Sequence, residues 1–200
     1  MVMKISDIQK EIKDSISHRL ESKGFFVDKS PTFYNIKDNL IRIVHIDFLS
    51  RKNATYFQSN TASFTLNLGV NYNIENKANF YPNEHDSHIK GCIIRTFRQK
   101  SPMDLKGFPL LHPERRRRDI WWVYRDASNL NNLLSNAVRV LDRKAIQWLE
   151  RYSDIDFVIR VLQSKKEIDP WKGGPFGMGK IGCPYRNDLI KELKNIYQIK

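Results

Sequence analysis

The sequence predicts an α+β fold, with one helix, an antiparallel sheet of about five strands and a covering layer of C-terminal helices. Thr61 to Ile74 (TASFTLNLGVNYNI) alternates apolar and polar residues without a break, which is typical of a strand with one buried face. Helical spacing of apolar residues precedes this strand and returns after residue 127. We therefore expect a single domain over 1–200, with helix and sheet in 1–127 and a helical part in 128–200.

The first helix is predicted from a period of four. Apolar residues recur at Ile8, Ile12, Ile16 and Leu20. Ser6 is followed three residues later by Gln9, a capping-box pattern, and Gly24 provides a C-terminal stop. The pattern predicts an amphipathic helix that begins near Ser6.

The remaining strands are predicted from β-branched and aromatic composition. Thr32–Lys37 and Leu40–Ser50 flank a turn and form a hairpin. Leu40–Ser50 is largely apolar on both faces, so we expect it to be covered on both sides. The hairpin leads into Thr61–Ile74, which we expect to be the central strand, with a polar second face that meets water or a polar groove. Cys92–Arg98 and Asp119–Arg125 are the last two predicted strands.

Two adjacent tryptophans lie in the last predicted strand. Because neighbouring strand residues point to opposite faces, Trp121 and Trp122 do not both enter one core. One of the two indoles must face something else.

The C-terminal part predicts three helices. Ser128 opens the longest apolar stripe, a second helix starts at Ser153, and Asn187–Gln198 closes the chain. Residues 172–182 are predicted to form a glycine-rich loop, and Arg51–Asn60 is predicted to be a polar turn.

Composition limits the classes of partner. The formal net charge is +12 and favours polyanionic partners. The N-terminus lacks the apolar run of a signal peptide, and no apolar run is long enough to span a membrane, so we expect a cytoplasmic protein. The two cysteines, Cys92 and Cys183, have no metal-binding spacing and are predicted to be reduced, small buried residues. No cofactor is predicted.

The basic charge is concentrated before the tryptophans. The stretch from Lys90 to Arg125 contains ten basic and three acidic residues, so its net charge is +7. Single-stranded nucleic acid is bound where guanidinium groups contact phosphates and a nearby indole stacks on a base. The candidate residues are Arg115, Arg116, Arg117, Arg118, Trp121, Trp122 and Arg125. The alternative is a solvated loop in which Arg118 pairs with Asp119.

Two weaker polar sites accompany this run. His45 and Asp47 share one strand face, and they suit either a base with its orienting carboxylate or a structural pair under a helix. Glu84, His85, Asp86 and His88 are possible metal ligands, but their spacing matches no zinc pattern, so an exposed loop is favoured.

The segment from Gly174 to Lys180 has the GxxxxGK spacing of a phosphate-binding loop. Ile181 stands where the loop needs a hydroxyl for Mg²⁺, and Gly182 with Pro184 prevents the required helix. We therefore reject a nucleoside triphosphatase, and the segment stays a candidate lid or binding loop.

The order of these motifs resembles a known family. The Gly24–Phe25 helix end, an aromatic hairpin with Phe33, the strand Phe64–Val70 (FTLNLGV) and Asp119-Ile120-Trp121-Trp122 before paired helices are similar to the bacterial domain of unknown function four-three-zero-four. The resemblance covers roughly residues 5 to 162 and leaves the glycine-rich segment unmatched. It implies a small bacterial protein, with a loose association to defence or toxin immunity, and it carries over no catalytic residue.

Three functions remain open. The first is a non-enzymatic binding module that recognises a protein partner through the polar sheet face and the rim from Arg115 to Arg125. The second is nucleic-acid binding through the same rim. The third is a metal-dependent hydrolase that uses His45, Asp47 and the loop from Glu84 to His88. The oligomeric state is not predicted.

Overall fold

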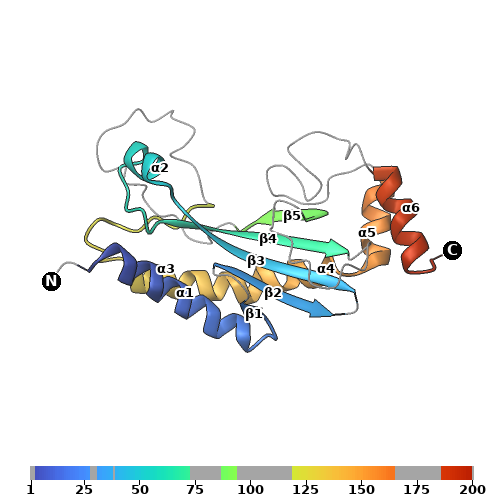
Figure 1. The fold of residues 1–200 in the computed structure, drawn as a ribbon, viewed down its shortest axis with the longest axis horizontal. Helices are drawn as coiled ribbons and strands as arrows, with labels where there is room; N and C mark the ends of the chain where they lie inside the picture. The colour runs from blue at the N-terminus through green and yellow to red at the C-terminus, as the bar shows by residue number, and fades with distance from the viewer. Residues whose placement is uncertain are drawn as a thin grey trace.

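The computed structural model describes residues 3–27, 31–37, 39–72, 87–93, 119–164 and 186–199. Within this part of the chain, helix α1 (Ile5–Glu21) is followed by a five-stranded antiparallel sheet and then by further helices (Figure 1). The predicted α+β class, with one helix before the sheet and helices after it, is confirmed.

The sheet keeps the order of the chain. Its strands are β1 (Phe26–Val27), β2 (Thr32–Lys37), β3 (Leu40–Phe48), β4 (Phe64–Tyr72) and β5 (Ile89–Cys92), in the spatial order β1-β2-β3-β4-β5. The predicted hairpin is therefore confirmed, and its turn residue Asn39 has a φ of 61°. The alternating strand is β4, which lies inside the sheet, but the middle strand is β3 and not β4 as expected.

Two predicted strands differ from the structure. The strand expected at Cys92–Arg98 begins earlier, at Ile89, and residues 94–98 lie outside the described part of the chain. Asp119–Arg125 forms only an isolated bridge between Trp121 and Phe64, whose two backbone hydrogen bonds measure 2.8 and 3.2 Å. Val123 N–H then donates to the hydroxyl of Ser63 at 2.9 Å, so a side chain takes over the pairing and the ladder ends.

The helices after the sheet fall where the apolar stripes predict them. They are α3 (Leu130–Val140), the π-helical turn η4 (Leu141–Ala145), α4 (Ile146–Arg151), α5 (Ile155–Ser164) and α6 (Arg186–Ile196). A short helix, α2 (Arg51–Tyr56), occupies the segment expected to be a polar turn. The hydroxyl of Ser50 caps it by accepting a hydrogen bond from Asn53 N–H at 3.2 Å.

The two ends of α1 show one wrong and one correct prediction. The helix begins at Ile5, with Lys4 at the N-cap position and no side-chain cap, so the capping box at Ser6 does not form. At the other end Gly24 has a φ of +78° and donates its N–H to the carbonyl of Glu21 at 2.9 Å, while Phe25 N–H reaches the carbonyl of Leu20 at 3.1 Å. This is the Schellman arrangement, which requires a left-handed residue and therefore favours glycine.

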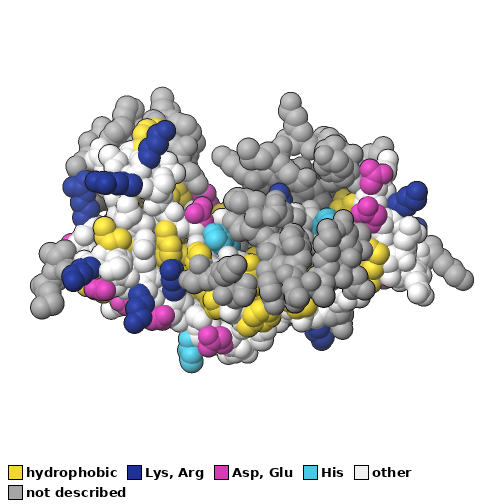
Figure 2. Space-filling view, in the orientation of Figure 1, with side chains coloured by type: hydrophobic (Ala, Val, Ile, Leu, Met, Phe, Trp, Pro, Cys, Tyr) yellow, Lys and Arg dark blue, Asp and Glu magenta, His cyan; other side chains and the backbone are white. Residues whose placement is uncertain are grey.

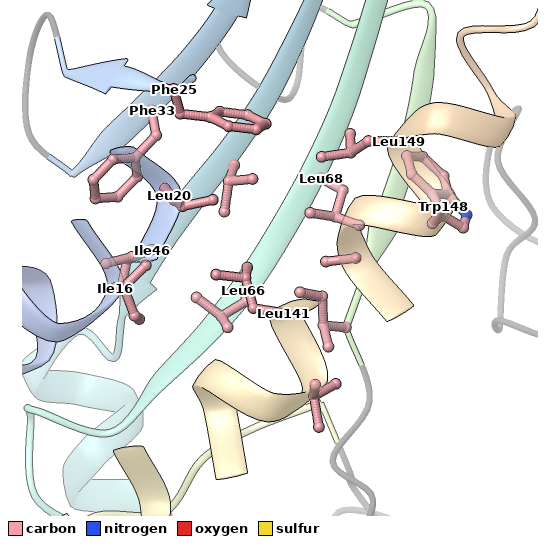
Figure 3. Packing of buried hydrophobic residues seen from close by; sticks show 14 of the residues in the cluster. Ile16, Leu20, Phe25, Phe33, Ile46, Leu66, Leu68, Leu141, Trp148 and Leu149 are labelled. Carbon is pink, nitrogen blue, oxygen red and sulfur yellow. The ribbon is translucent and has the colours of Figure 1, made fainter. Parts of the chain in front are cut away.

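The main core lies on one face of the sheet. Residues of α1, α3, η4, α4, α5 and α6 all contribute to it, together with the apolar residues of β4. Figure 3 shows Ile16 of α1 beside Ile46 of β3, and Leu141 of η4 and Leu149 of α4 beside Leu66 and Leu68 of β4. At the β5 edge the indole of Trp148 occupies the space that a side chain at position 91 would need, so Gly91 lets α4 approach the sheet. The helical layer thus covers one face of the sheet.

The second face of the sheet carries two smaller apolar clusters. Tyr34, Ile41 and Ile43 form one cluster, and Phe57, Ile120 and Trp122 form the other with Leu49 packed against them. The expectation that β3 is covered on both sides is only partly correct, because Ile41 and Ile43 are buried on the second face whereas His45 is half-buried and Asp47 is exposed. The expectation that the polar face of β4 meets water is only partly correct, because Thr65 and Asn71 are each just 8% exposed whereas Asn67 is half-buried. Ser87 lies directly over Gly69 on this face.

Candidate functional site

The candidate site is a row of polar side chains on the second face of the sheet, which we call the polar band. It consists of Asp47 and His45 on β3, Asn67 on β4, and Cys92 and Lys90 on β5. His45 lies opposite Asn67, and Asn67 lies opposite Cys92, so the three side chains stand in one line across three strands. The register places all five residues on the face opposite the main core.

A neighbouring strand fixes the orientation of the histidine. The Nδ1 atom of His45 lies 2.7 Å from the hydroxyl oxygen of Thr32, which is opposite His45 on β2. The sequence predicted that His45 pairs with Asp47. In the structure the Nδ1 atom of His45 instead forms a cross-strand hydrogen bond with Thr32. Asp47 is exposed and lies on the face away from the main helical layer. The imidazole consequently has one defined orientation within the polar band.

Asn67 is the middle residue of the polar band. It is half-buried on an interior strand, and its side chain makes no hydrogen bond to the residues that the structure describes. An amide carries two donor hydrogens and an acceptor oxygen. Asn67 thus has a hydrogen-bonding capacity that the described fold does not use.

The two ends of the polar band carry opposite charges. Asp47 and Lys90 are both exposed, and they lie on different strands with Asn67 between them. Cys92 is half-buried, so the prediction that it is a buried residue is only partly correct. A surface of this kind offers donors, acceptors and both signs of charge to a partner, and it suits recognition of a polar macromolecular surface.

The structure places the two predicted tryptophans in separate cores. The indole of Trp121 stacks on the ring of Phe64, with centroids 5.5 Å apart and an interplanar angle of 7°. The indole of Trp122 meets Phe57 edge to face at 5.1 Å in the second-face cluster. Both residues are 0% exposed, so the expectation that one indole stacks on a base is wrong. The expectation that they point to opposite faces is confirmed.

The other sequence candidates have different outcomes. Arg125 is exposed, and Arg115, Arg116, Arg117 and Arg118 lie outside the described residues. The segment 84–86 and the glycine-rich loop 172–182 also lie outside them, so those interpretations stay predictions. His88 is described, and its Nδ1 accepts a hydrogen bond from the backbone N–H of Tyr72 at 3.2 Å. Among the described residues no three His, Cys, Asp or Glu side chains are placed to share a metal ion.

Sequence reasoning missed three members of the polar band as site residues, namely Asn67, Lys90 and Cys92. The alternation of Thr61–Ile74 already assigned Asn67 to the polar face, so its position was available from the sequence. That His45 and Cys92 lie on either side of it depends on the pairing of three strands, and no local pattern contains this register.

The comparisons with known proteins leave the chain unassigned. No family model, no curated protein and no solved structure matches it. The resemblance to the family of unknown function therefore stays a prediction. In the part of the chain that the structure describes, no helix combines the length and apolar character needed to cross a bilayer.

Proposed function

We propose that the chain is a non-enzymatic binding module that recognises a macromolecular partner through the polar band. The observation that carries this proposal is the position of Asn67, an unengaged amide between His45 and Cys92 on the face opposite the helical layer. Loops or tight turns usually hold binding residues, but here paired strands hold them, so the row is rigid before a partner arrives.

The helical face is a poorer candidate for this role. The buried apolar residues of α1, α3, α4 and α6 belong to the main core. The exposed surface of α1 mixes acidic Asp7 and Asp14 with basic Lys10. Such mixed charge is typical of a solvated helix surface. The polar band is the surface on which half-buried polar residues gather in a defined register.

The experiment is a quantitative affinity purification from the cells of origin with two variants. Asn67→Arg places a long charged side chain in the middle of the polar band. Gln147→Arg makes a matched amide-to-arginine change at an exposed position of α4. Circular dichroism and thermal unfolding establish that both variants are folded before they are used.

We expect a specific partner to be retained by the wild type and by Gln147→Arg and to be lost with Asn67→Arg. Reconstitution of that pair from purified components then gives the dissociation constants directly. Equal retention by all three proteins would contradict a role for the polar band.

A further inference from the structure

A second surface of interest is the short helix α2 and its surroundings, which we call the α2 corner. It is formed by Arg51, Lys52 and Tyr56. All three residues are exposed. Figure 2 shows Lys and Arg side chains gathered over α2 beside a side chain of the hydrophobic class, which includes tyrosine.

The charge of α2 is not explained by helix stability. Arg51 and Lys52 are the first two residues of the helix, and no acidic residue occurs in its first turn. The backbone N–H groups at the start of a helix carry partial positive charge, so cations there are unfavourable and acidic residues are preferred. Between Ser50 and Asn60 the chain has two basic residues and no acidic one. The two cations therefore do not stabilise the helix through its dipole.

Among the residues that the structure describes, Tyr56 is the most exposed of the large apolar and aromatic side chains, at 53%. Its ring contacts Phe57 edge to face at 5.0 Å, and Phe57 in turn contacts Trp122 at 5.1 Å. A buried aromatic cluster thus supports the exposed ring from behind. An aromatic ring with one supported side and a large exposed fraction is a platform on which another flat group can stack.

The two kinds of side chain are close together. Lys52 and Tyr56 are four residues apart in one helix, so they lie on the same side of it. A cation adjacent to an exposed ring provides one contact for a phosphate and one for a base.

We propose that the α2 corner is a contact site for single-stranded nucleic acid, with Tyr56 stacking on a base and Lys52 and Arg51 contacting phosphates. A duplex hides the faces of its bases, so a stacking platform selects unpaired nucleotides. The net charge of +12 attracts such a polyanion to the whole molecule, and the α2 corner determines where it binds. The site uses none of the residues of the polar band and stands independently of it.

The test is fluorescence anisotropy with a labelled oligouridine and, separately, a labelled DNA duplex, at low and at physiological salt. Tyr56→Ala is expected to weaken binding of the oligouridine by about tenfold, because one stacked base is lost. Tyr56→Phe keeps the ring and is expected to bind like the wild type. Lys52→Glu is expected to weaken binding and to reduce the slope of log affinity against log salt by about 0.7, the value for one phosphate contact on a single strand.

Two controls separate the site from general charge and from folding. Lys10→Glu makes the same charge change on α1, on the other side of the sheet, and is expected to weaken binding much less than Lys52→Glu. Lys52→Glu places an acidic residue in the first turn of α2, where negative charge is favourable. The melting temperature of this variant is therefore expected to equal or exceed that of the wild type. Weaker binding without lower stability excludes a merely structural role.

The proposal is overturned by any of the following results. The wild type fails to bind oligouridine at low salt, Tyr56→Ala binds as tightly as the wild type, or Lys10→Glu weakens binding as much as Lys52→Glu. Equal affinity for the duplex and the single strand would also contradict it, since stacking would then contribute nothing.

Discussion

Trp121 and Trp122 are adjacent in the chain, yet their indoles are buried in two different cores on opposite faces of the sheet. Trp121 stacks on Phe64 in the main core, and Trp122 packs against Phe57 beneath α2. A single backbone bridge between Trp121 and Phe64 holds the pair at the edge of β4. The segment therefore joins the helical layer to the second face, on which both proposed sites lie.

The burial of Trp122 predicts a large effect on stability. Trp122→Ala removes a fully buried indole and is expected to lower the free energy of unfolding by about 3–5 kcal/mol. Equilibrium urea denaturation measures this change. An exposed indole would cost less than about 0.5 kcal/mol, so a small effect would show that the second-face cluster does not form.

Gly91 is expected to tolerate no side chain. A Cβ atom at this position would lie 2.8 Å from Cζ2 of Trp148 and 3.1 Å from Cε2 of the same indole, which is closer than normal contact. Gly91→Ala should therefore lower the free energy of unfolding by about 1–3 kcal/mol, the usual cost of overpacking. Lys90→Ala, at the exposed neighbouring position, is the control and should change it by less than about 0.5 kcal/mol. Equal values for the two variants would contradict the packing of α4 on β5.

Gly24 is expected to be required for its backbone conformation. Its φ of +78° is in the left-handed region, and an added Cβ would lie 3.2 Å from Nδ2 of Asn35. Gly24→Ala should lower the free energy of unfolding by about 1–2 kcal/mol. Lys23→Ala, one residue earlier and exposed, should have little effect. Thermal unfolding followed by circular dichroism compares the two, and an unchanged melting temperature for Gly24→Ala would exclude the Schellman arrangement.

The stability of the fold is expected to fall at alkaline pH. Tyr72 is buried, and its hydroxyl donates to the carbonyl of Tyr152 at 2.5 Å. Burial, followed by the charges of Tyr197, Tyr152 and Asp154, raises the pKa of Tyr72 well above its ordinary value of 10.0. The folded state thus keeps the proton that the unfolded chain loses. The stabilisation is complete below about pH 10 and decreases as the pH rises above it.

Tyr72→Phe tests this dependence. Loss of the hydrogen bond should lower the free energy of unfolding at neutral pH by about 1–2 kcal/mol. The variant should lose less stability than the wild type between pH 9 and pH 11, a range chosen to span the ordinary tyrosine pKa of 10.0. Urea denaturation at each pH measures both effects. Parallel pH profiles for the two proteins would show that Tyr72 is not the group responsible.

Sequence patterns predicted the parts of the fold that repeat over many residues. The alternation in β4 and the apolar stripes of α1, α3, α4 and α5 each depend on local periodicity, and each was found. α2 was missed because six residues are too few for an amphipathic period. The prediction of a strand at Asp119–Arg125 was wrong because the backbone N–H and carbonyl of Val123 bond to Ser63 and Asn60 instead of continuing a strand ladder. Ser63 and Val123 are sixty residues apart in the chain, so no local pattern contains this contact.

The candidate sites were less accessible to sequence reasoning. The polarity of His45, Asp47 and Asn67 could be assigned to one sheet face, but the bond from His45 to Thr32 depends on strand register. Similarly, strand alternation predicted that Trp121 and Trp122 point to opposite faces, but it did not predict which residues cover Trp122. That Tyr56 is the exposed aromatic residue at this corner followed only from the packing of Phe57 on Trp122.

The most direct test of the binding face compares thiol reactivity at two neighbouring positions of β4. In a background with both native cysteines replaced by serine, Asn67→Cys places a thiol on the polar band, and Leu68→Cys places one in the main core. We expect the thiol at position 67 to react with a maleimide in the native state and the thiol at position 68 to react only on unfolding. Equal protection of the two thiols would mean that the second face is closed, and it would contradict recognition through the polar band.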